Sequence, residues 1–341
     1  MNLAELNKVA EAMVAPGRGI LAADESSGTI KRRFDAIGVE CTEDNRRDYR
    51  ELMFRSTEAM SKYISGVILY DETIRQKAKD GTPLVKVIEK AGSLPGIKVD
   101  KGIKPLPFCT GEVITEGLDG LGERLAEYRK LGAKFAKWRA VVDIGPGIPT
   151  YNCIKANAHA LARYAALCQQ EDIVPIVEPE VLMDGDHDID RCFEVTEQTL
   201  KIVFNELFDA HVQLEGIVLK PNMIVPGKKS GKKASVQEVA EKTVAVLKLC
   251  VPAAVPGIAF LSGGQSDELA TAHLDAMNKI GGLPWKLTFS YGRALQAPVQ
   301  KTWGGKSENV AAAQRAFAHR AEMNGLAALG KWKAEMEKKA A

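Results

Sequence analysis

Eight short runs of β-branched and apolar residues recur along this chain, and longer stretches with helical periodicity separate them. The runs lie at residues 19–23, 65–70, 96–99, 135–139, 174–177, 216–219, 257–261 and 286–290. The clearest helical patterns cover residues 120–131, 154–169, 236–249 and 267–279. Strands that alternate with helices pair in parallel, because each helix carries the chain back to the same end of the sheet. Eight such units predict an α/β fold, a (β/α)8 TIM barrel.

The length of the chain fits one such barrel. It has 341 residues, and no linker, repeat or low-complexity tract divides them. We therefore expect a single domain over residues 1–341, with the barrel at about residues 15–300, an extra helix before it and a helical tail after it.

Charge and cysteine content narrow the setting of the protein. A formal net charge of +2 gives no reason to expect nucleic acid or a membrane surface as the main partner. The six cysteines are scattered without a C-x-x-C pair, which indicates reduced thiols. Residues 1–8 have a helical pattern unlike a signal peptide, and no stretch approaches the roughly 18 apolar residues of a membrane span. We expect a cytoplasmic protein.

The structural alternative is an open, doubly wound sheet, whose signature would be a glycine-rich phosphate turn after its first strand. Gly117, Gly120 and Gly122 give only a broken G-x-G pattern, and they open a helix without a preceding strand. Residues 227–232 resemble a P-loop, but their glycine spacing is one residue short. We interpret this second segment as a solvated basic loop, so neither pattern favours a nucleotide site.

Lys220 ends the sixth apolar run, and Pro221 follows it directly. Proline has no N–H to give to the sheet, so the strand should stop there and leave the lysine at the edge of an apolar core. Burial disfavours the ammonium form, and a lysine whose pKa falls from about 10.4 towards neutrality is an amine nucleophile for carbonyl substrates. The alternative is a lysine that reaches from the strand end to water.

Polar residues stand at the carboxyl ends of nearly all the predicted strands, where the active site of a TIM barrel lies. In chain order they are Asp24, Glu25 and Ser26, then Lys98 and Asp100, Lys137 and Arg139, Glu178 and Glu180, Lys220, Ser262, Gly263 and Gly264, and finally Ser290, Tyr291, Gly292 and Arg293. So many charges on one rim would be costly as structure alone. We therefore interpret the rim as an active site.

Two lysines and three carboxylates of this rim suit one kind of chemistry. They are Lys137, Lys220, Asp24, Glu178 and Glu180. A second ammonium favours the neutral form of Lys220, and a nearby glutamate can move protons while a carbinolamine forms and loses water. These groups match a Schiff-base carbon–carbon lyase, in which the iminium is the electron sink and a carboxylate takes a hydroxyl proton.

Two groups of anion-binding residues flank Lys220. On one side lie the glycine-rich turn at 262–264 and Gly292 with Arg293, where barrels commonly hold a phosphate. On the other side, hydroxyl and basic side chains suit a second phosphate, namely Ser26, Ser27, Thr29, Arg32, Arg33, Lys98 and Arg139. Two anion sites around a lysine indicate a bisphosphorylated ketose as the substrate.

Seven motifs resemble class I fructose-1,6-bisphosphate aldolase. They lie at residues 21–26 (LAADES), 96–102 (GIKVDKG), 135–139 (FAKWR), 176–180 (IVEPE), 219–223 (LKPNM), 261–266 (LSGGQS) and 288–293 (TFSYGR), and the likeness runs in order from about residue 5 to about residue 330. The resemblance implies a (β/α)8 barrel, usually a homotetramer, that needs no cofactor or metal. It would cleave fructose 1,6-bisphosphate to dihydroxyacetone phosphate and glyceraldehyde 3-phosphate in glycolysis and gluconeogenesis.

The resemblance also implies roles for individual residues. Lys220 would be the Schiff-base lysine and Glu178 the proton-transferring carboxylate, supported by Asp24, Lys137 and Glu180. The ketone-side phosphate would contact Ser262, Gly263, Gly292 and Arg293, with Ser290 as a further substrate contact. The opposite phosphate would contact Ser26, Thr29 and Lys98, with Arg33 and Arg139 nearby, and Arg46 corresponds to an arginine sometimes assigned to substrate binding.

The end of the chain departs from this pattern. Animal members of the family end in a flexible tail with a terminal tyrosine that assists proton exchange on the enamine. Residues 331–341 instead form a charged helical pattern without tyrosine. The resemblance therefore leaves open which group protonates the enamine.

Two other hypotheses remain. A metal-dependent aldolase would use zinc as the electron sink, and residues 184–188 form a polar cluster with one of the five histidines. We prefer to interpret that cluster as a solvated loop. A non-catalytic scaffold for partner binding would not need the lysine, the carboxylates and both groups of phosphate-binding residues that this chain retains.

Overall fold

The structure is a computed structural model that describes residues 1–339. Eight parallel strands close into a barrel in the order β1-β10-β9-β8-β7-β6-β3-β2. They are β1 (Gly19–Ala23), β2 (Ile64–Leu69), β3 (Leu94–Lys98), β6 (Phe135–Val142), β7 (Val174–Val181), β8 (Val218–Leu219), β9 (Gly257–Phe260) and β10 (Lys286–Tyr291). Each predicted run supplies one barrel strand, so the expected TIM barrel is confirmed.

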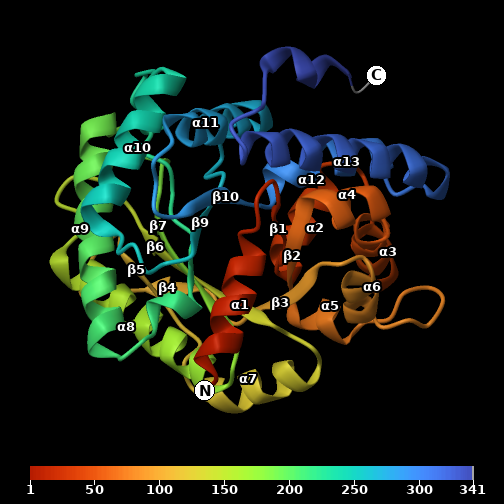
Figure 1. The fold of residues 1–341 in the computed structure, drawn as a ribbon, viewed down its shortest axis with the longest axis horizontal. Helices are drawn as coiled ribbons and strands as arrows, with labels where there is room; N and C mark the ends of the chain where they lie inside the picture. The colour runs from red at the N-terminus through yellow and green to blue at the C-terminus, as the bar shows by residue number, and fades with distance from the viewer. Residues whose placement is uncertain (340–341) are drawn as a thin grey trace.

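Helices surround the barrel and extend beyond it at both ends of the chain (Figure 1). They are α1 (Leu3–Met13), α2 (Ser27–Asp35), α3 (Glu43–Phe54), α4 (Thr57–Tyr63), α5 (Asp71–Arg75), α6 (Leu84–Lys90), α7 (Leu121–Lys130), α8 (Tyr151–Gln170), α9 (Ile189–Asp209), α10 (Val236–Cys250), α11 (Asp267–Ile280), α12 (Arg293–Trp303) and α13 (Val310–Ala327). Short 3₁₀ helices lie at η1 (Leu214–Gly216), η2 (Ser307–Asn309) and η3 (Ala334–Lys339). The four helical patterns named from the sequence correspond to α7, α8, α10 and α11. Of the expected helical tail, residues 334–339 are 3₁₀ and the last two residues lie outside the described part.

Six helices follow a residue whose side chain caps them, among them α1 and α3, which follow Asn2 and Thr42, and four long outer helices. Thr150, Asp188, Ser235 and Ser266 precede α8, α9, α10 and α11, and each side-chain oxygen accepts the N–H three residues further on. Such a contact satisfies one of the N–H groups that a helix start leaves without a partner, and replacing it with alanine typically costs about 1 kcal/mol. The starts of these helices are therefore fixed by local sequence.

The amino-terminal end of the barrel interior is apolar, and α1 covers it. Leu6, Ala10 and Met13 of α1 share one buried cluster with strand residues such as Ile20 and Val218. In Figure 1, α1 accordingly lies across the strands and not beside them. Burial of this face, at about 25 cal/mol per Å² of apolar surface, holds the extra helix to the barrel.

Phe135 of β6 fills the same end of the barrel, and its ring leaves room only for glycine at one position in each of β2 and β3. A Cβ at Gly66 of β2 would lie 2.8 Å from the Phe135 ring, and a Cβ at Gly96 of β3 would overlap that ring. These glycines make room for an aromatic side chain and are not needed for turns. Because apolar side chains fill this end, polar side chains can occupy only the carboxyl-terminal part of the barrel interior.

One antiparallel hairpin lies outside the barrel and was not predicted. It consists of β4 (Ile103–Pro105) and β5 (Val113–Thr115), between β3 and α7. Three-residue strands are too short to show an alternating pattern. The helix that Gly117 and Gly120 precede therefore does follow a strand, contrary to our expectation. That strand pairs antiparallel, so it is not the parallel unit of a dinucleotide site.

The barrel strands that differ most in length from their predictions are β6, β7 and β8, and β6 continues from Arg139 to Val142. β8 is only Val218–Leu219, because residues 214–216 form the 3₁₀ turn η1. β7 continues through Pro179 to Val181. The apolar run indicates an end at Val177 because the charged residue Glu178 follows it. The extension places Glu178 and Glu180 within the strand itself.

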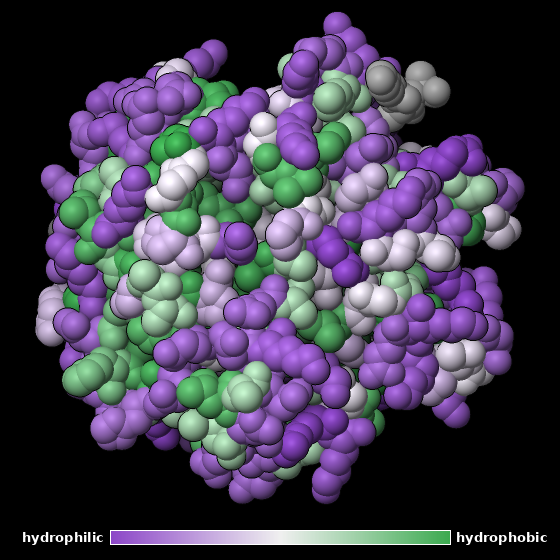
Figure 2. Space-filling view, viewed as in Figure 1, coloured by the Kyte–Doolittle hydropathy of each residue, from purple (hydrophilic) through white to green (hydrophobic). Residues whose placement is uncertain are grey.

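The face of the molecule shown in Figure 2 is predominantly hydrophilic. Figure 2 shows the face that carries α1, on which hydrophobic residues occur in scattered groups. Single exposed apolar side chains such as Phe108 are usual on folded proteins. Among the helices of residues 1–339, none is long and apolar enough to cross a membrane.

Candidate active site

A cavity of about 1270 Å³ opens at the carboxyl ends of the barrel strands. Its polarity arises because the inward side chains of each strand, two residues apart, change from apolar to polar along the strand. In β6, Phe135 belongs to the apolar cluster, whereas Lys137 and Arg139 line the cavity. In β7, Ile176 belongs to the cluster and Glu178 lines the cavity. The cavity thus collects charged side chains from adjacent strands.

Lys220 lies in the wall of this cavity, directly after β8. Its backbone N–H donates to the carbonyl of Val177 at 2.8 Å, so it keeps its place beside β7 although Pro221 ends the ladder. Its side chain is only 5% exposed, and its Nζ lies 3.1 Å from Oε1 of Glu178. The lysine therefore does not reach out to water, and the alternative interpretation of its position is wrong.

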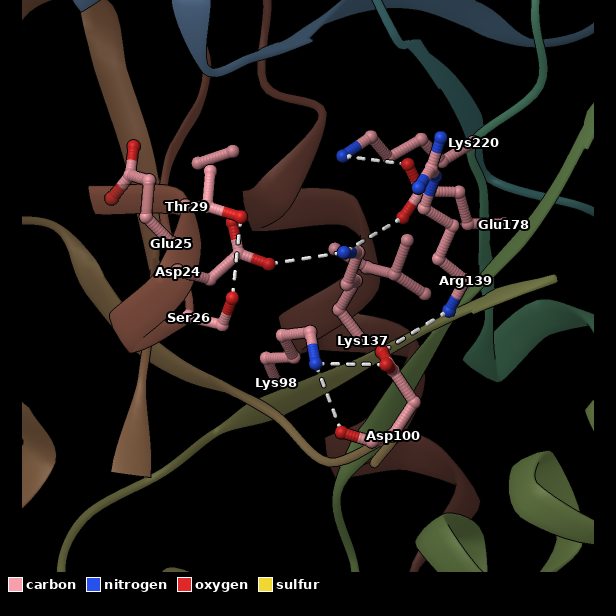
Figure 3. Close-up of polar contacts among 12 residues, drawn as sticks. Asp24, Glu25, Ser26, Thr29, Lys98, Asp100, Lys137, Arg139, Glu178 and Lys220 are labelled. Atoms are coloured by element: carbon pink, nitrogen blue, oxygen red, sulfur yellow. Dashed lines mark hydrogen bonds and ion pairs between the residues drawn. The ribbon is translucent and has the colours of Figure 1, made fainter. Parts of the chain in front are cut away.

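A chain of ion pairs crosses the cavity from Lys220 to Asp24 (Figure 3). Glu178 contacts Lys220 through Oε1, and its Oε2 lies 3.3 Å from Nζ of Lys137. The same Nζ lies 3.0 Å from Oδ2 of Asp24. None of the four side chains is more than 13% exposed, so their charges are screened far less than surface charges.

These ion pairs determine the direction in which the pKa values of two of the four groups are shifted. Burial alone would raise the pKa of the Asp24 carboxyl, but Lys137 and Lys220 offset this effect and lower it to about 2. Burial opposes the ammonium of Lys137, yet Asp24 and Glu178 raise its pKa above the ordinary value. At neutral pH, Asp24 is therefore a carboxylate and Lys137 an ammonium.

Four of the residues that line the cavity have a buried side-chain atom without a hydrogen-bond partner within residues 1–339. The atoms are Oε2 of Glu25, Nε of Arg124, Oε2 of Glu178 and Oγ of Ser290. Lys137 is close enough to Oε2 of Glu178 for an ion pair, but the two groups are not aligned for a hydrogen bond. Since about nine in ten buried polar groups are satisfied, such atoms mark positions where polar groups of a ligand fit.

One end of the cavity is formed by the start of α2 and the end of β3. Ser26 precedes α2, and its hydroxyl bonds Oγ1 of Thr29 at 3.2 Å and does not cap the helix. The first N–H groups of α2 are therefore available to an anion. Lys98 lies across from them, with its Nζ 2.8 Å from a carboxylate oxygen of Asp100.

Two of the arginines that line the cavity and were predicted to bind phosphate are each held by a carboxylate. Arg33 lies 2.5 Å from Oε1 of Glu25, and Arg139 lies 2.5 Å from Oε2 of Glu180. Burial opposes the charge of Arg139, but Glu180 raises the pKa of this guanidinium. Both arginines are thus fixed cations at the wall.

The other anion-binding end is formed by the loop after β9 and the start of α12, and because β10 pairs with β1, Gly292 of this end lies near Arg33 of the first. Gly263 and Gly264 have φ angles of +57° and +82°, which glycine adopts without strain. Gly292 precedes α12, and a Cβ at this position would lie 3.3 Å from the carbonyl oxygen of Ala22. Small residues here leave backbone N–H groups accessible, and Arg293 is the first residue of the helix.

Every residue to which the resemblance assigns a role, except one, lines this cavity, whereas Ser27 and Tyr291, also named from the sequence, do not. Those present are Asp24, Ser26, Thr29, Arg33, Lys98, Lys137, Arg139, Glu178, Glu180, Lys220, Ser262, Gly263, Ser290, Gly292 and Arg293. Arg46 of α3 is outside it. The guanidinium of Arg46 pairs with Glu72 and donates to the carbonyl of Cys41 at 2.7 Å. These partners occupy the arginine, so the geometry does not support the hypothesis that it contacts substrate.

Seven charged residues that the sequence did not assign to the site also line the cavity, namely Asp71, Arg75, Lys101, Arg124, Glu127, Asp184 and Lys228. Lys228 and Asp184 come from two segments that we had interpreted as solvated loops, and they form an ion pair of 2.8 Å at the cavity wall. His187, in the same cluster as Asp184, is buried. Within residues 1–339, no group of three or more His, Cys, Asp or Glu side chains is arranged to hold a metal ion.

The whole chain matches a protein family. A family model described as Fructose-bisphosphate aldolase class-I covers residues 5–341. The chain belongs to the class-I fructose-bisphosphate aldolase family. A protein of Xanthomonas campestris pv. campestris named "Probable fructose-bisphosphate aldolase class 1" is 59% identical over 334 residues, which are 98% of this chain and 100% of the relative. The "Fructose-bisphosphate aldolase" of Drosophila melanogaster is 55% identical over 96% of this chain and 91% of its own.

The fold of a solved aldolase agrees closely. The fructose-bisphosphate aldolase of Plasmodium falciparum, solved in complex with TRAP and a small molecule inhibitor, shares 50% of its sequence with this chain. The TM-score is 0.96, with 97% of this chain and 96% of that chain covered. The resemblance seen in the seven motifs is thereby confirmed. As a member of this family, the present chain is a carbon–carbon lyase of glycolysis that acts on a sugar bisphosphate.

Proposed function

We propose that Lys220 is the amine that forms the Schiff base with fructose 1,6-bisphosphate. The observation that carries this proposal is the buried position of its Nζ, 3.1 Å from Glu178 and between the two ends of the cavity that suit phosphates. Lys137 is a poorer nucleophile, because its two carboxylates raise its pKa and keep it charged.

Glu178 moves the protons of imine formation. The Lys220 amine attacks the ketone carbonyl, and the resulting carbinolamine must lose its hydroxyl as water. Glu178 takes a proton from the nitrogen and delivers one to the leaving hydroxyl. Oε1 of Glu178 faces Lys220, and Oε2 has no hydrogen bond to residues 1–339, so both oxygens can take part.

The carbon–carbon bond breaks once the iminium has formed. A carboxylate takes the proton of the C4 hydroxyl, the aldehyde leaves, and the bond electrons move to the iminium nitrogen as an enamine. We assign this proton to Glu178. Lys137 stabilises the developing negative oxygen, Asp24 holds Lys137 in place, and Glu180 holds Arg139. Protonation of the enamine and hydrolysis release dihydroxyacetone phosphate and restore Lys220.

The two phosphates occupy the two anion-binding ends of the cavity. The ketone-side phosphate binds the residues after β9 and β10, namely Ser262, Gly263, Ser290, Gly292 and Arg293. The aldehyde-side phosphate binds the start of α2 and the cations near it, namely Ser26, Thr29, Lys98, Arg33 and Arg139. Arginine and helix-start N–H groups are the usual partners of such anions.

We also propose that the enzyme is a cytoplasmic homotetramer in which residues 1–341 form one domain, without cofactor or metal. All six cysteines are free, as suits a reducing compartment. Light scattering measures the assembly, and activity in EDTA is expected to stay intact. Loss of activity on chelation would favour the metal-dependent alternative.

The decisive test is borohydride reduction of the enzyme mixed with dihydroxyacetone phosphate, followed by peptide mass mapping. An adduct on Lys220 supports the proposal, and an adduct on another lysine would reassign the nucleophile. No adduct together with no turnover would support the scaffold alternative.

A further inference from the structure

Two cations from different elements converge on one glycine of the loop after β9. Lys228 lies in the segment after β8 and lines the cavity. A Cβ at Gly264 would lie 2.6 Å from Nζ of Lys228 and 2.9 Å from Nη2 of Arg293. Gly264 lies in the turn that forms the ketone-side end of the cavity. The mechanism above uses Arg293 there but gives Lys228 no task.

The backbone holds Lys228 in this position. Three successive N–H groups, those of residues 227 to 229, donate to carbonyls of residues 183 to 187 at 2.7 to 2.9 Å. The middle bond joins Lys228 itself to the carbonyl of Met183 at 2.7 Å. Gly227 packs so tightly on residue 185 that a Cβ there would overlap its carbonyl. The approach of Lys228 to Gly264 is thus set by a braced loop, and only its outer side chain is free to move.

The two cations at this spot are unequally paired. Asp184 lies 2.8 Å from Nζ of Lys228 and neutralises one cation. Arg293 forms no ion pair with any residue in the described range 1–339. Only one carboxylate is paired with these two cations, and Asp267 acts on Arg293 from a greater distance, so the spot beside the glycine turn can accept an anion. Cations this close repel one another unless an anion lies between them.

The carboxylate of Asp184 is only loosely committed to Lys228. The side chains of Lys228 and Asp184 are 43% and 58% exposed, and ion pairs of that exposure contribute about 0–1 kcal/mol. A phosphate dianion with three oxygen acceptors is a stronger partner for an ammonium than one exposed carboxylate. Lys228 can therefore turn from Asp184 to a phosphate with little loss.

We propose that Lys228 binds the ketone-side phosphate together with Arg293, and that Asp184 holds the lysine ready when the cavity is empty. The inference rests on the proposed function, since it needs a phosphate at this end. It extends the site to a residue outside the seven motifs. Lys228 then strengthens the binding of every ligand that carries the ketone-side phosphate, whether or not that ligand also carries the aldehyde-side phosphate.

The test compares two single substitutions in the same loop. Lys228→Gln removes the charge beside Gly264. Lys232→Gln is the matched control, because Lys232 pairs with Asp188 at 3.2 Å and does not line the cavity. The readouts are the dissociation constant of dihydroxyacetone phosphate, from the concentration dependence of borohydride trapping, and kcat and KM for two ketose phosphates. Those ketoses are fructose 1,6-bisphosphate and fructose 1-phosphate.

Lys228→Gln should raise the dissociation constant of dihydroxyacetone phosphate about 3- to 30-fold, the range for a partly exposed charged contact. KM should rise by a similar factor for both ketoses, because both carry the ketone-side phosphate, while kcat stays within about twofold. Lys232→Gln should leave the dissociation constant and the kcat and KM values for both ketoses unchanged. Equal dissociation constants for the two variants, or a KM effect on the bisphosphate alone, would overturn the inference.

Asp184→Asn separates binding from mere support of the loop. It removes a negative charge beside the phosphate and leaves the backbone bonds of Lys228 in place, so dihydroxyacetone phosphate should bind as tightly or more tightly. Weakening as large as in Lys228→Gln would show that the pair is structural. Failure of the proposed function differs visibly, because the unsubstituted enzyme would then give no adduct on Lys220, and both proposals would fall.

Discussion

The Nζ of Lys220 lies 3.1 Å from Oε1 of Glu178, and it leaves the other oxygen of that carboxylate to Lys137. One carboxylate thus stands between two buried amines. Lys137 is further bound by Asp24, so it is held as a charged group, whereas Lys220 has Glu178 as its carboxylate partner. This asymmetry distinguishes a nucleophile from a fixed cation within the same cavity.

Lys220→Met should abolish turnover, because the amine that forms the imine is gone and methionine fills a similar space. Glu178 keeps Lys137 as a partner, so the fold should persist with a nearly unchanged melting temperature. Steady-state rates and thermal melting measure the two effects. A near-normal rate would remove Lys220 from the mechanism.

Glu178→Gln should slow cleavage by about 10² to 10⁴, the usual share of general acid–base catalysis. The amide keeps the shape of the carboxylate but cannot accept the protons of dehydration and cleavage. Rapid-quench trapping with borohydride should show slower adduct formation on Lys220. If adduct formation kept its normal rate while turnover fell, Glu178 would act only in the later cleavage step.

Arg293→Ala should raise KM for fructose 1,6-bisphosphate about tenfold or more, because a charged partner of the phosphate is lost. The effect on kcat should be small, since Arg293 is proposed to contact the phosphate and not the reacting carbons. Initial-rate kinetics over a wide substrate range provide the measurement. An unchanged KM would contradict a phosphate contact at the start of α12.

The barrel and most of its charged rim were predictable because strand position and side-chain direction follow from simple periodicity. Lys137, Glu178 and Lys220 sit on or beside inward-facing strand positions, so knowing the strands sufficed to bring them together. The packing at the amino-terminal end of the barrel interior could not be predicted in this way. Nothing in the sequence indicated that Phe135 requires glycine at positions 66 and 96.

Loops were the part that the sequence could not place. Lys228 reaches the cavity only because its loop is hydrogen-bonded to residues 183–187, a long-range contact without a local pattern. Arg46 is withheld from the cavity for a similar reason, since its partner Glu72 is 26 positions away in α5. In both cases the position of a charge depends on a partner that no local motif identifies.

Arg46→Ala should lower the free energy of unfolding by about 1–3 kcal/mol and leave KM within about twofold. The substitution removes the partner of Glu72 and a donor to the carbonyl of Cys41, although Arg50 still lies 3.3 Å from Glu72. Urea unfolding and substrate kinetics on one preparation provide both numbers. A tenfold rise in KM at unchanged stability would return Arg46 to the binding site.

His273 should make the fold sensitive to mildly acidic pH. It is 2% exposed, burial lowers its pKa to about 4, and its Nδ1 lies 2.5 Å from Oε1 of Gln265. Gln265 in turn donates to the carbonyl of Ser262, in the ketone-side phosphate turn. A neutral histidine thus supports that turn from behind.

The direction of the effect follows from proton binding. The unfolded chain takes up a proton at His273 below its ordinary pKa of about 6.5, whereas the folded chain does so only near pH 4. Stability from this group is therefore complete above pH 6.5 and is lost as the pH falls towards 4, by up to about 3 kcal/mol. His273→Gln should flatten the dependence of the unfolding free energy on pH by up to about 1.4 kcal/mol per pH unit in this window. Denaturant titrations at several pH values test this, and parallel curves for the two proteins would assign the acid sensitivity to other groups.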